Sequence, residues 1–181
     1  MTCITTFSGL EFDYSNPVTK SICINDIAQS LSYECRFAGH LPAFYSVAQH
    51  SWLLSQLVPD EFAFEALLYN ASATYCGDIP SPLKQMLPDY RAIEHQIDAV
   101  IREKFGLPEK RSEIVHFYNL LLLANERKAL DIHGGEEWTM PKGISVEKIA
   151  IYPLLPSKIH TVFMARFDEL TGGLYGSENN T

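Results

Sequence analysis

Four polar side chains interrupt apolar stretches of the sequence, and their types decide what chemistry they can do. His50 falls on an apolar stripe with three- and four-residue steps, so it is expected to point inward. Tyr69 and Asn70 stand side by side in another apolar run, and Asn119 lies in a third. A buried divalent metal site needs imidazole and carboxylate ligands, whereas a phenol with a pKa of roughly 10 and two uncharged amides bind such ions poorly. Most of this set therefore cannot act as metal ligands.

The composition predicts one buried domain covering residues 1–181. The chain has 181 residues, of which 46% are hydrophobic and 20% are charged, enough for one core and short for two. The net charge of -8 disfavours direct binding to nucleic acid. It leaves open both a basic protein partner and a simple role in solubility.

The cysteines and the N-terminal residues favour a cytoplasmic protein. The four cysteines have no C-x-x-C spacing, so they indicate neither a zinc site nor a redox motif. The first residues lack the basic and apolar regions of a signal peptide, and no apolar run reaches the length of a membrane span. We therefore expect no membrane partner.

The elements that must position the four polar side chains are mainly helices. Residues 1–24 alternate in a way that predicts a small β-hairpin, with turn signals around Ser8-Gly9 and again at residues 15–17. Residues 25–171 are expected to form the helical body, and Asn25-Asp26 are expected to cap its first helix. The polar tail at residues 172–181 is expected to fray. The fold class is therefore mainly α, with five to seven helices.

Apolar spacing and breakers place the longer helices. The expected helices cover residues 46–57, 59 to about 79, 89–105, 112–130 and 156–170. The second of these begins at Pro59-Asp60, contains Tyr69 and Asn70, and is ended by Pro80 and Pro82. Gly134-Gly135 mark the end of the fourth helix, and residues 136–151 are expected to be irregular.

Ordered blocks along nearly the whole chain resemble the HD-domain metal-dependent phosphohydrolases. The likeness is to a phage and prophage branch that is similar to bacterial 5'-deoxynucleotidases, and it implies an HD-domain-like helical bundle. The blocks are Thr6-Phe7-Ser8-Gly9, Ile24-Asn25-Asp26-Ile27-Ala28, Cys35-Arg36-Phe37-Ala38-Gly39-His40, Phe44-Tyr45-Ser46-Val47-Ala48-Gln49-His50, Gly77-Asp78-Ile79-Pro80-Ser81-Pro82-Leu83-Lys84, Leu87-Pro88-Asp89-Tyr90 and Glu126-Arg127.

The resemblance implies a metal site whose ligands are mostly replaced in this chain. The family holds a divalent ion such as Mn, Co or Zn with a His, a His-Asp pair and a distant Asp, and a Glu moves protons. His50 matches the first ligand, whereas Tyr69-Asn70 replace the His-Asp pair, Asn119 replaces the Asp and Ala73 replaces the Glu. We expect no bound metal and no phosphohydrolase activity by the family mechanism. Uncharged replacements also avoid burying unbalanced carboxylates in a pocket without metal.

The resemblance also implies residues around the former substrate. Arg36, His40, Asp78 and Lys84 match such positions, and Arg36 would suit a phosphate. A loop anchor for Arg36 and a cap or salt bridge for Asp78 are equally simple interpretations. Glu126-Arg127 is most simply a structural ion pair or a surface pair on a helix.

Three functions follow from these observations. The first is a phage- or prophage-encoded pseudoenzyme that acts by binding a host protein, for example in replication or antiviral defence. The second is a module that binds or sequesters a nucleotide in the vacated pocket. The third is a residual 5'-nucleotidase that recruits ligands such as His40 or Asp78. Relatives often look like dimers, so a homodimer is also open.

Overall fold

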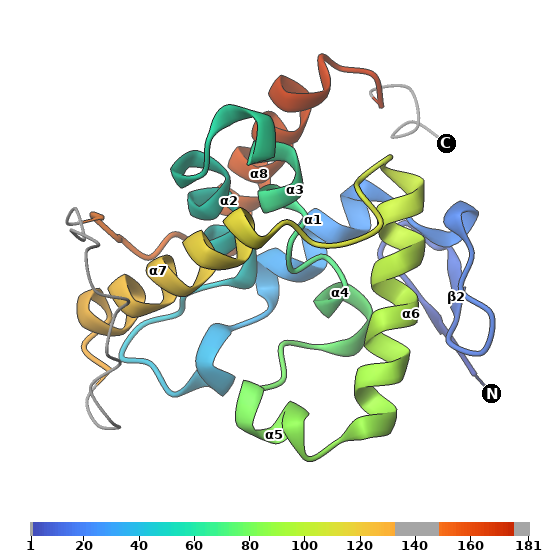
Figure 1. Cartoon of the computed structure of the whole chain (residues 1–181), viewed down its shortest axis with the longest axis horizontal. Coiled ribbons are helices and arrows are strands. Elements are labelled where there is room, and N and C mark those ends of the chain that lie inside the picture. The colour runs from blue at the N-terminus through green and yellow to red at the C-terminus, as the bar shows by residue number, and fades with distance from the viewer. Residues whose placement is uncertain (1, 133–148, 176–181) are drawn as a thin grey trace.

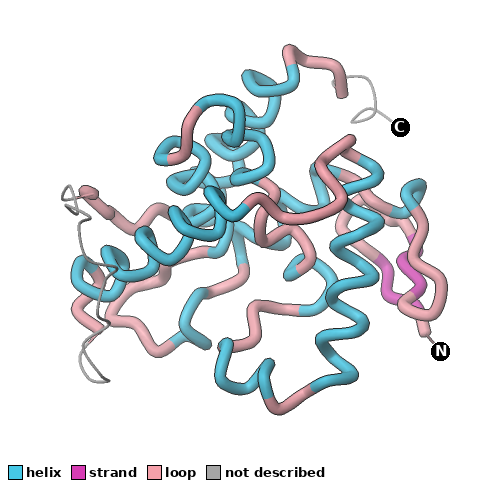
Figure 2. Tube along the Cα trace, viewed as in Figure 1, coloured by secondary structure: helices cyan, strands magenta, loops and turns pink. Residues whose placement is uncertain are grey.

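Residues 2–132 and 149–175 are described by the computed structural model, and they form eight α-helices and one two-stranded sheet (Figure 1, Figure 2). The predicted mainly helical class with a small N-terminal hairpin is confirmed. The strands are β1 (Cys3–Thr5) and β2 (Glu11–Asp13). The α-helices are α1 (Ile24–Tyr33), α2 (Val47–Leu57), α3 (Ala63–Leu67), α4 (Ala73–Cys76), α5 (Ser81–Gln85), α6 (Pro88–Lys104), α7 (Glu113–Ala129) and α8 (Pro156–Thr171). Three short 3-10 helices are η1 (Thr19–Ser21), η2 (Arg36–Gly39) and η3 (Asp60–Phe62).

The N-terminal hairpin packs on the helical body through its second strand. β1 and β2 pair antiparallel, with Ile4 opposite Phe12. Gly9 turns the chain between them with a φ of 84°, a conformation that glycine adopts without strain. Phe12 is fully buried, and its ring stacks on that of Tyr75 with centroids 4.0 Å apart. The predicted β element does not continue to residue 24, because the 3-10 helix η1 follows the turn signal at residues 15–17.

The prediction that Asn25-Asp26 cap the first helix is wrong. α1 begins at Ile24 after Cys23, whose side chain makes no capping bond. Asp26 is 2% exposed and accepts hydrogen bonds from the Ser8 backbone N–H at 2.6 Å and from the Ser8 hydroxyl at 2.7 Å. The carboxylate therefore anchors the hairpin turn to α1, a long-range contact that local capping preferences cannot reveal.

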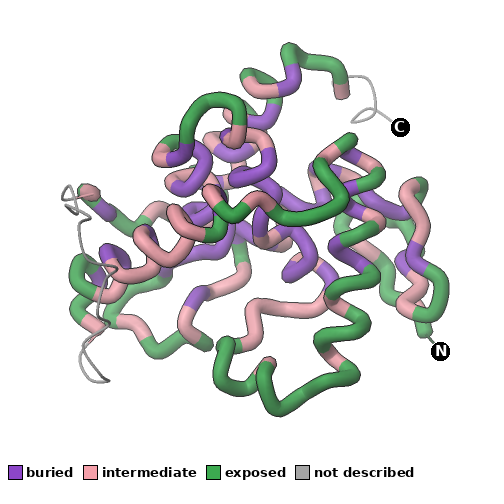
Figure 3. Tube along the Cα trace, in the orientation of Figure 1, coloured by how far each residue is buried: buried purple, intermediate pink, exposed green. Residues whose placement is uncertain are grey.

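Helix α2 occupies the centre of the helical body. It begins where the sequence predicts, because the Ser46 hydroxyl accepts a hydrogen bond from the Gln49 N–H at 3.1 Å. It packs against α1, α3, α7 and α8. Two buried hydrophobic clusters meet here, since α2 contributes Val47 and Ala48 to one and Leu54 to the other. The buried stretches gather around this centre, whereas α5 lies in an exposed part of the trace (Figure 3).

The long helix predicted from Pro59-Asp60 to about residue 79 is interrupted. It is divided into η3, α3 and α4, and residues 68–72 between α3 and α4 form tight turns. Their backbone bonds span three residues, from Tyr69 N to Ala66 O and from Ala73 N to Asn70 O. Tyr69 and Asn70 therefore lie in a tightened turn, and not in the regular helix that the apolar spacing predicts.

The remaining long helices agree with the sequence prediction. α6 begins at Pro88, α7 follows Ser112, and α8 ends at Gly172, which is left-handed with a φ of 61°. In the part of the tail that is described, the Tyr175 ring packs on Phe105 and Phe167. The predictions for Gly134-Gly135, for residues 136–148 and for residues 176–181 lie outside the described residues. None of the helices in the described ranges is long and apolar enough to cross a membrane.

The hairpin anchor generates a stability prediction. Asp26→Ala removes the acceptor for both Ser8 donors, and hydrogen bonds to a charged group contribute about 1.5–3 kcal/mol each. We expect the free energy of unfolding to fall by at least about 3 kcal/mol in urea denaturation. The exposed acid Glu103 on α6 offers a control, and Glu103→Ala should change stability by less than about 0.5 kcal/mol. Equal effects of the two substitutions would contradict the anchoring role.

Candidate functional site

A fully buried carboxylate, Glu126 on α7, lies beneath the candidate site. It is 0% exposed and has three side-chain partners from distant parts of the chain. Arg36 donates to its Oε2 at 2.9 Å, and the Tyr45 hydroxyl donates to its Oε1 at 2.7 Å. The His50 Nδ1 lies 2.5 Å from the same Oε1. These contacts join η2, the segment before α2, α2 itself and α7 at one point.

The partners keep this buried carboxylate ionised. Burial alone raises the pKa of Glu126, but the neighbouring His50 and Arg36 and the hydrogen bonds from His50 and Tyr45 lower it to about 2. Burial and the adjacent carboxylate raise the pKa of Tyr45, so its hydroxyl stays a neutral donor. The group that sequence reasoning treats as a simple helical pair is thus the buried ionic centre of this region.

The side chains at the expected metal-ligand positions do not fit a metal ion. Both ring nitrogens of His50 are engaged, since Nε2 lies 2.9 Å from the Asn119 Oδ1 while Nδ1 contacts Glu126. The Asn70 Nδ2 donates to the Ser51 hydroxyl at 3.3 Å. Burial raises the pKa of Tyr69, so its phenol is a neutral and poor ligand. In the described ranges, no three His, Cys, Asp or Glu side chains come together to hold a cation.

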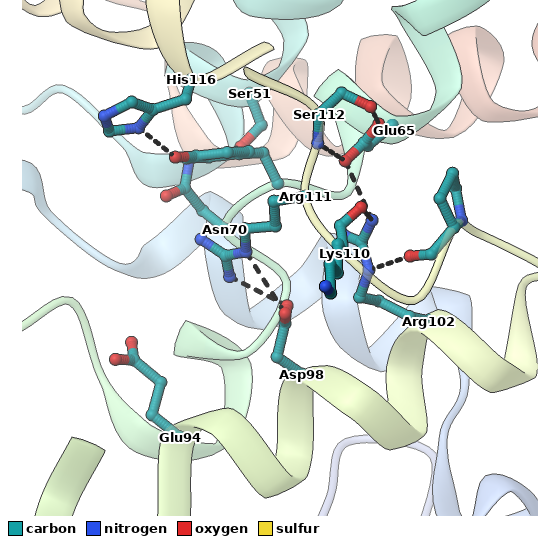
Figure 4. Close-up of polar contacts among 12 residues, drawn as sticks. Ser51, Glu65, Asn70, Glu94, Asp98, Arg102, Lys110, Arg111, Ser112 and His116 are labelled. Atoms are coloured by element: carbon teal, nitrogen blue, oxygen red, sulfur yellow. Dashed lines mark hydrogen bonds and ion pairs between the residues drawn. The ribbon is translucent and has the colours of Figure 1, made fainter. Parts of the chain in front are cut away.

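A second polar cluster forms around Tyr69. Its hydroxyl lies 2.9 Å from the His116 Nδ1, and the Arg111 guanidinium lies 4.6 Å from the centre of its ring. Asp98 on α6 accepts two hydrogen bonds from Arg111, one from Nη2 at 2.9 Å and one from Nε at 3.2 Å. Figure 4 shows Arg111 between Asp98 on α6 and His116 on α7. The guanidinium is therefore held at its edge by a carboxylate and on its face by an aromatic ring.

The loop that carries Arg111 is fixed by a further buried ion pair, between Arg102 and Glu65. Arg102 on α6 donates to the Glu65 Oε1 at 2.9 Å, to the Pro108 carbonyl at 2.5 Å and to the Lys110 carbonyl at 3.1 Å. Glu65 also accepts hydrogen bonds from the Ser112 N–H and hydroxyl, at 2.9 and 2.6 Å (Figure 4). The start of α7 and the residues before it are thus tied to α3 and α6.

These clusters border a pocket of about 580 Å³. One wall is a face of α7 with three- and four-residue steps, and the others come from η2, the turn at residues 69–70 and the segment from residue 78 to α5. The lining residues are Arg36, Phe37, Tyr69, Asn70, Asp78, Ile79, Pro80, Ser81, Pro82, Lys84, Gln85, Arg111, His116, Asn119, Leu120, Leu123 and Arg127. Four of them are cationic and one is acidic, the opposite balance to that of the whole chain.

Several of these cations are backed by a carboxylate. Arg36 pairs with Glu126, Arg111 pairs with Asp98, and Lys84 pairs with Glu94 on α6. Such pairing orients a cation and reduces its net charge, so a ligand would be held mainly by the remaining N–H donors. Within the described residues, the buried Nε of Arg36 has no hydrogen-bond partner.

The residues predicted to bind ligand are mostly, but not entirely, brought together. Arg36, Asp78 and Lys84 line the pocket, whereas His40 is exposed and is not part of the lining. Of the positions at which the resemblance expects the metal site, Tyr69, Asn70 and Asn119 line the pocket, while His50 and Ala73 are buried outside the lining. Sequence reasoning missed Arg111, His116 and Arg127. The three- and four-residue steps from His116 through Asn119 and Leu123 to Arg127 could have indicated one face of a helix.

The segments leading into the pocket have unusual backbone conformations. Phe37 and Ala38 are left-handed, with φ of 55° and 52°, although neither is glycine. Such conformations cost about 1 kcal/mol or more for each residue and often occur at ligand sites. On the other side, Gly77 has a φ of 78° and directs the chain from α4 into the pocket wall. The Glu34 carboxylate then accepts the Asp78 N–H at 3.1 Å.

Comparison with known proteins gives one informative match. No family model matches the chain. The chain is 52% identical over 172 residues to the uncharacterized protein YfdR of Escherichia coli (strain K12), a match that covers 94% of this chain and 97% of that protein. The match therefore covers nearly the whole length of both chains.

The buried carboxylate gives a pH-dependent prediction. Glu126 has a pKa of about 2 in the fold against an ordinary 4.5. Its contribution to stability is therefore complete above pH 4.5 and is lost as the pH falls through about 2, a change on the order of 3 kcal/mol. Glu126→Gln should lower the free energy of unfolding by about 3 kcal/mol at neutral pH. It should also flatten the pH dependence in that window, as measured by urea unfolding over a pH series.

The exposed acid at the start of the same helix provides the control. Glu113→Gln should leave the slope of stability against pH close to that of the unaltered protein, because Glu113 is exposed. If Glu126→Gln and the unaltered protein lose stability in parallel as the pH falls, then Glu126 is not the ionic centre of this region.

Proposed function

The chain belongs to the same family as YfdR of Escherichia coli. We propose that it binds a nucleotide without hydrolysing it. In this proposal it is a cytoplasmic and catalytically inactive relative of the HD-domain phosphohydrolases. The single observation that carries this proposal is the composition of the pocket. Its walls offer cationic N–H donors, while the positions expected to hold a metal lack carboxylates and carry side chains that are hydrogen-bonded to one another or to neighbouring residues.

The pocket has groups suited to each part of a nucleotide. Guanidinium and ammonium groups bind phosphate through charge-assisted hydrogen bonds, and Arg36, Lys84, Arg111 and Arg127 line the pocket. The amides of Asn70 and Asn119 can donate and accept hydrogen bonds to sugar or base, and Phe37 adds an aromatic surface. A volume of about 580 Å³ falls within the range of small-molecule sites.

The absence of ligand chemistry at the former metal positions supports binding over turnover. Hydrolysis by the family mechanism needs an ion to make hydroxide and a carboxylate to carry a proton. Here the corresponding side chains are a phenol, two amides and the methyl group of Ala73. Residual nucleotidase activity through His40 or Asp78 has little support. His40 is not part of the pocket lining, and Asp78 lines it but belongs to no group of three possible metal ligands among the described residues. This alternative would regain support from turnover of a deoxynucleoside monophosphate that disappears in His50→Ala.

Binding to a host protein, in replication or antiviral defence, stays a prediction that rests on the acidic charge of the chain. An encoding phage or prophage and a homodimer also remain predictions from the resemblance.

A thermal-shift screen of 5'-nucleoside monophosphates tests nucleotide binding. At least one should raise the unfolding temperature at a concentration well above its Kd, because a ligand of the native state stabilises it by RT ln(1 + [L]/Kd). The nucleoside lacking phosphate should give a much smaller shift, and chromatography should recover the nucleotide intact.

Matched variants decide whether this pocket is responsible. Lys84→Met should weaken binding about tenfold, because Lys84 lines the pocket. Lys20→Met removes an exposed lysine outside the lining, and His40→Ala removes the predicted contact that the fold leaves outside it, so both should bind like the unaltered protein. If no nucleotide gives a shift, or if Lys20→Met and Lys84→Met behave alike, the proposal is wrong.

Elemental analysis tests the metal-free pocket. After incubation with manganese, cobalt or zinc and dialysis, the protein should retain less than about a tenth of an equivalent of each ion. The reason is that His50 is engaged at both ring nitrogens and the other expected positions lack anionic ligands. Near-stoichiometric metal that disappears in His50→Ala would contradict this expectation.

A further inference from the structure

We propose that Arg111 is a preassembled anion-binding residue that holds the phosphate of the pocket's ligand without a metal ion. The inference deepens the proposed function and rests on it for the identity of the ligand, but the anion subsite can be tested by itself.

The Arg111 guanidinium contacts Asp98 along one edge. Asp98 engages Nε and Nη2 and leaves Nη1 to other partners, of which the Tyr69 side chain is one. The Arg111 side chain is 36% exposed and lines the pocket, whereas the Asp98 side chain is 13% exposed and is not part of the lining. The carboxylate thus lies beneath the guanidinium and leaves part of the donor fork facing the pocket.

The Arg111 side chain is held in place from several sides. Arg111 sits between the carboxylate of Asp98 and the ring of Tyr69, whose centre lies 4.6 Å from the guanidinium carbon. The residues on both sides of it are tied down, because Arg102 donates to the Lys110 carbonyl and the Ser112 N–H donates to Glu65. A donor that is already ordered loses little conformational entropy when a ligand binds.

Tyr69 links Arg111 to a neighbouring pocket residue, His116. Arg111 opposes the burial effect that raises the pKa of Tyr69, which makes the phenol a better hydrogen-bond donor. The Tyr69 hydroxyl and the His116 Nδ1 lie 2.9 Å apart, within hydrogen-bond distance. His116 is exposed and lines the same pocket, so it places a second polar side chain beside Arg111.

The guanidinium of Arg111 is suited to a ligand that carries an oxyanion. A guanidinium presents parallel N–H groups whose spacing matches two oxygens of one phosphate or carboxylate group. Tyr69 stands at the turn between α3 and α4, so Arg111 brings a fixed positive group to a position where the resemblance expects a metal ligand. A phosphomonoester can be held there by protein donors alone.

The test uses inorganic phosphate as the probe and isothermal titration with EDTA present. The full-length protein should bind phosphate, and Arg111→Met should weaken binding at least about tenfold, as expected for loss of a charge-assisted contact. Arg111→Lys keeps the charge but loses the planar fork, so its affinity should fall between the two. Arg91→Met removes an exposed arginine of α6 outside the lining and should bind like the unaltered protein.

Circular dichroism and the unfolding temperature establish that the variants are folded, and Arg111→Lys provides a variant with less disturbance of Asp98. Equal phosphate binding by Arg111→Met, absence of phosphate binding by the unaltered protein, or binding that requires added manganese would each overturn the inference.

The same titrations separate this inference from the proposed function. If phosphate binds through Arg111 while no nucleotide binds, the anion subsite stands and the nucleotide function fails. If nucleotides bind equally well after Arg111→Met, the nucleotide function stands and the assignment of Arg111 fails.

Discussion

The buried carboxylate of Glu126 is the interaction on which this part of the structure depends. An ionised carboxylate with no exposure to water is very costly unless it has charged and hydrogen-bonding partners. Arg36, Tyr45 and His50 supply them, and each comes from a different segment of the first half of the chain. Satisfying one side chain therefore holds η2 and α2 against α7, and both η2 and α7 line the pocket. His50, an inward-pointing side chain of the kind a metal site needs, is committed to this structural role.

The same arrangement recurs on the other side of the pocket. Glu65 fixes the start of α7 through Ser112 and Arg102, and Asp98 orients Arg111. Asp98 positions a donor of the pocket wall directly, whereas Glu65 holds the chain on either side of that donor. The pocket is consequently rich in oriented N–H groups although the protein as a whole is acidic. A site built in this way gains specificity from donor geometry more than from net charge. This physical feature links the two buried networks to the proposal of a nucleotide held without metal.

Local sequence signals predicted the positions of the helices well and the roles of their charged residues poorly. Ser46 and Pro88 mark helix starts through effects that act within one turn, so the starts of α2 and α6 followed from sequence. Ser112 also precedes its helix as predicted, but its side chain makes no capping bond and donates to Glu65 instead. Glu126 resembled an ordinary helical pair because its partners lie 76, 81 and 90 residues away. Asp26 was mistaken for a cap for the same reason, since its partner Ser8 is 18 residues distant. The break at residues 68–72 was missed because apolar spacing continues through it, while the backbone tightens into three-residue turns.

By itself, the sequence determined which chemistry is available. Asn70, Asn119, Tyr69 and Ala73 cannot supply the anionic ligands and proton carrier of a hydrolytic metal site, and that conclusion needs no coordinates. The tertiary structure decided which side chains meet. It placed Arg111 and His116 beside Tyr69, left His40 outside the pocket lining and buried Glu126 beneath the pocket. The physical reason is that side-chain chemistry and helix formation are local properties. Burial and charge pairing depend instead on how helices far apart in the chain pack together, which no short stretch of residues encodes.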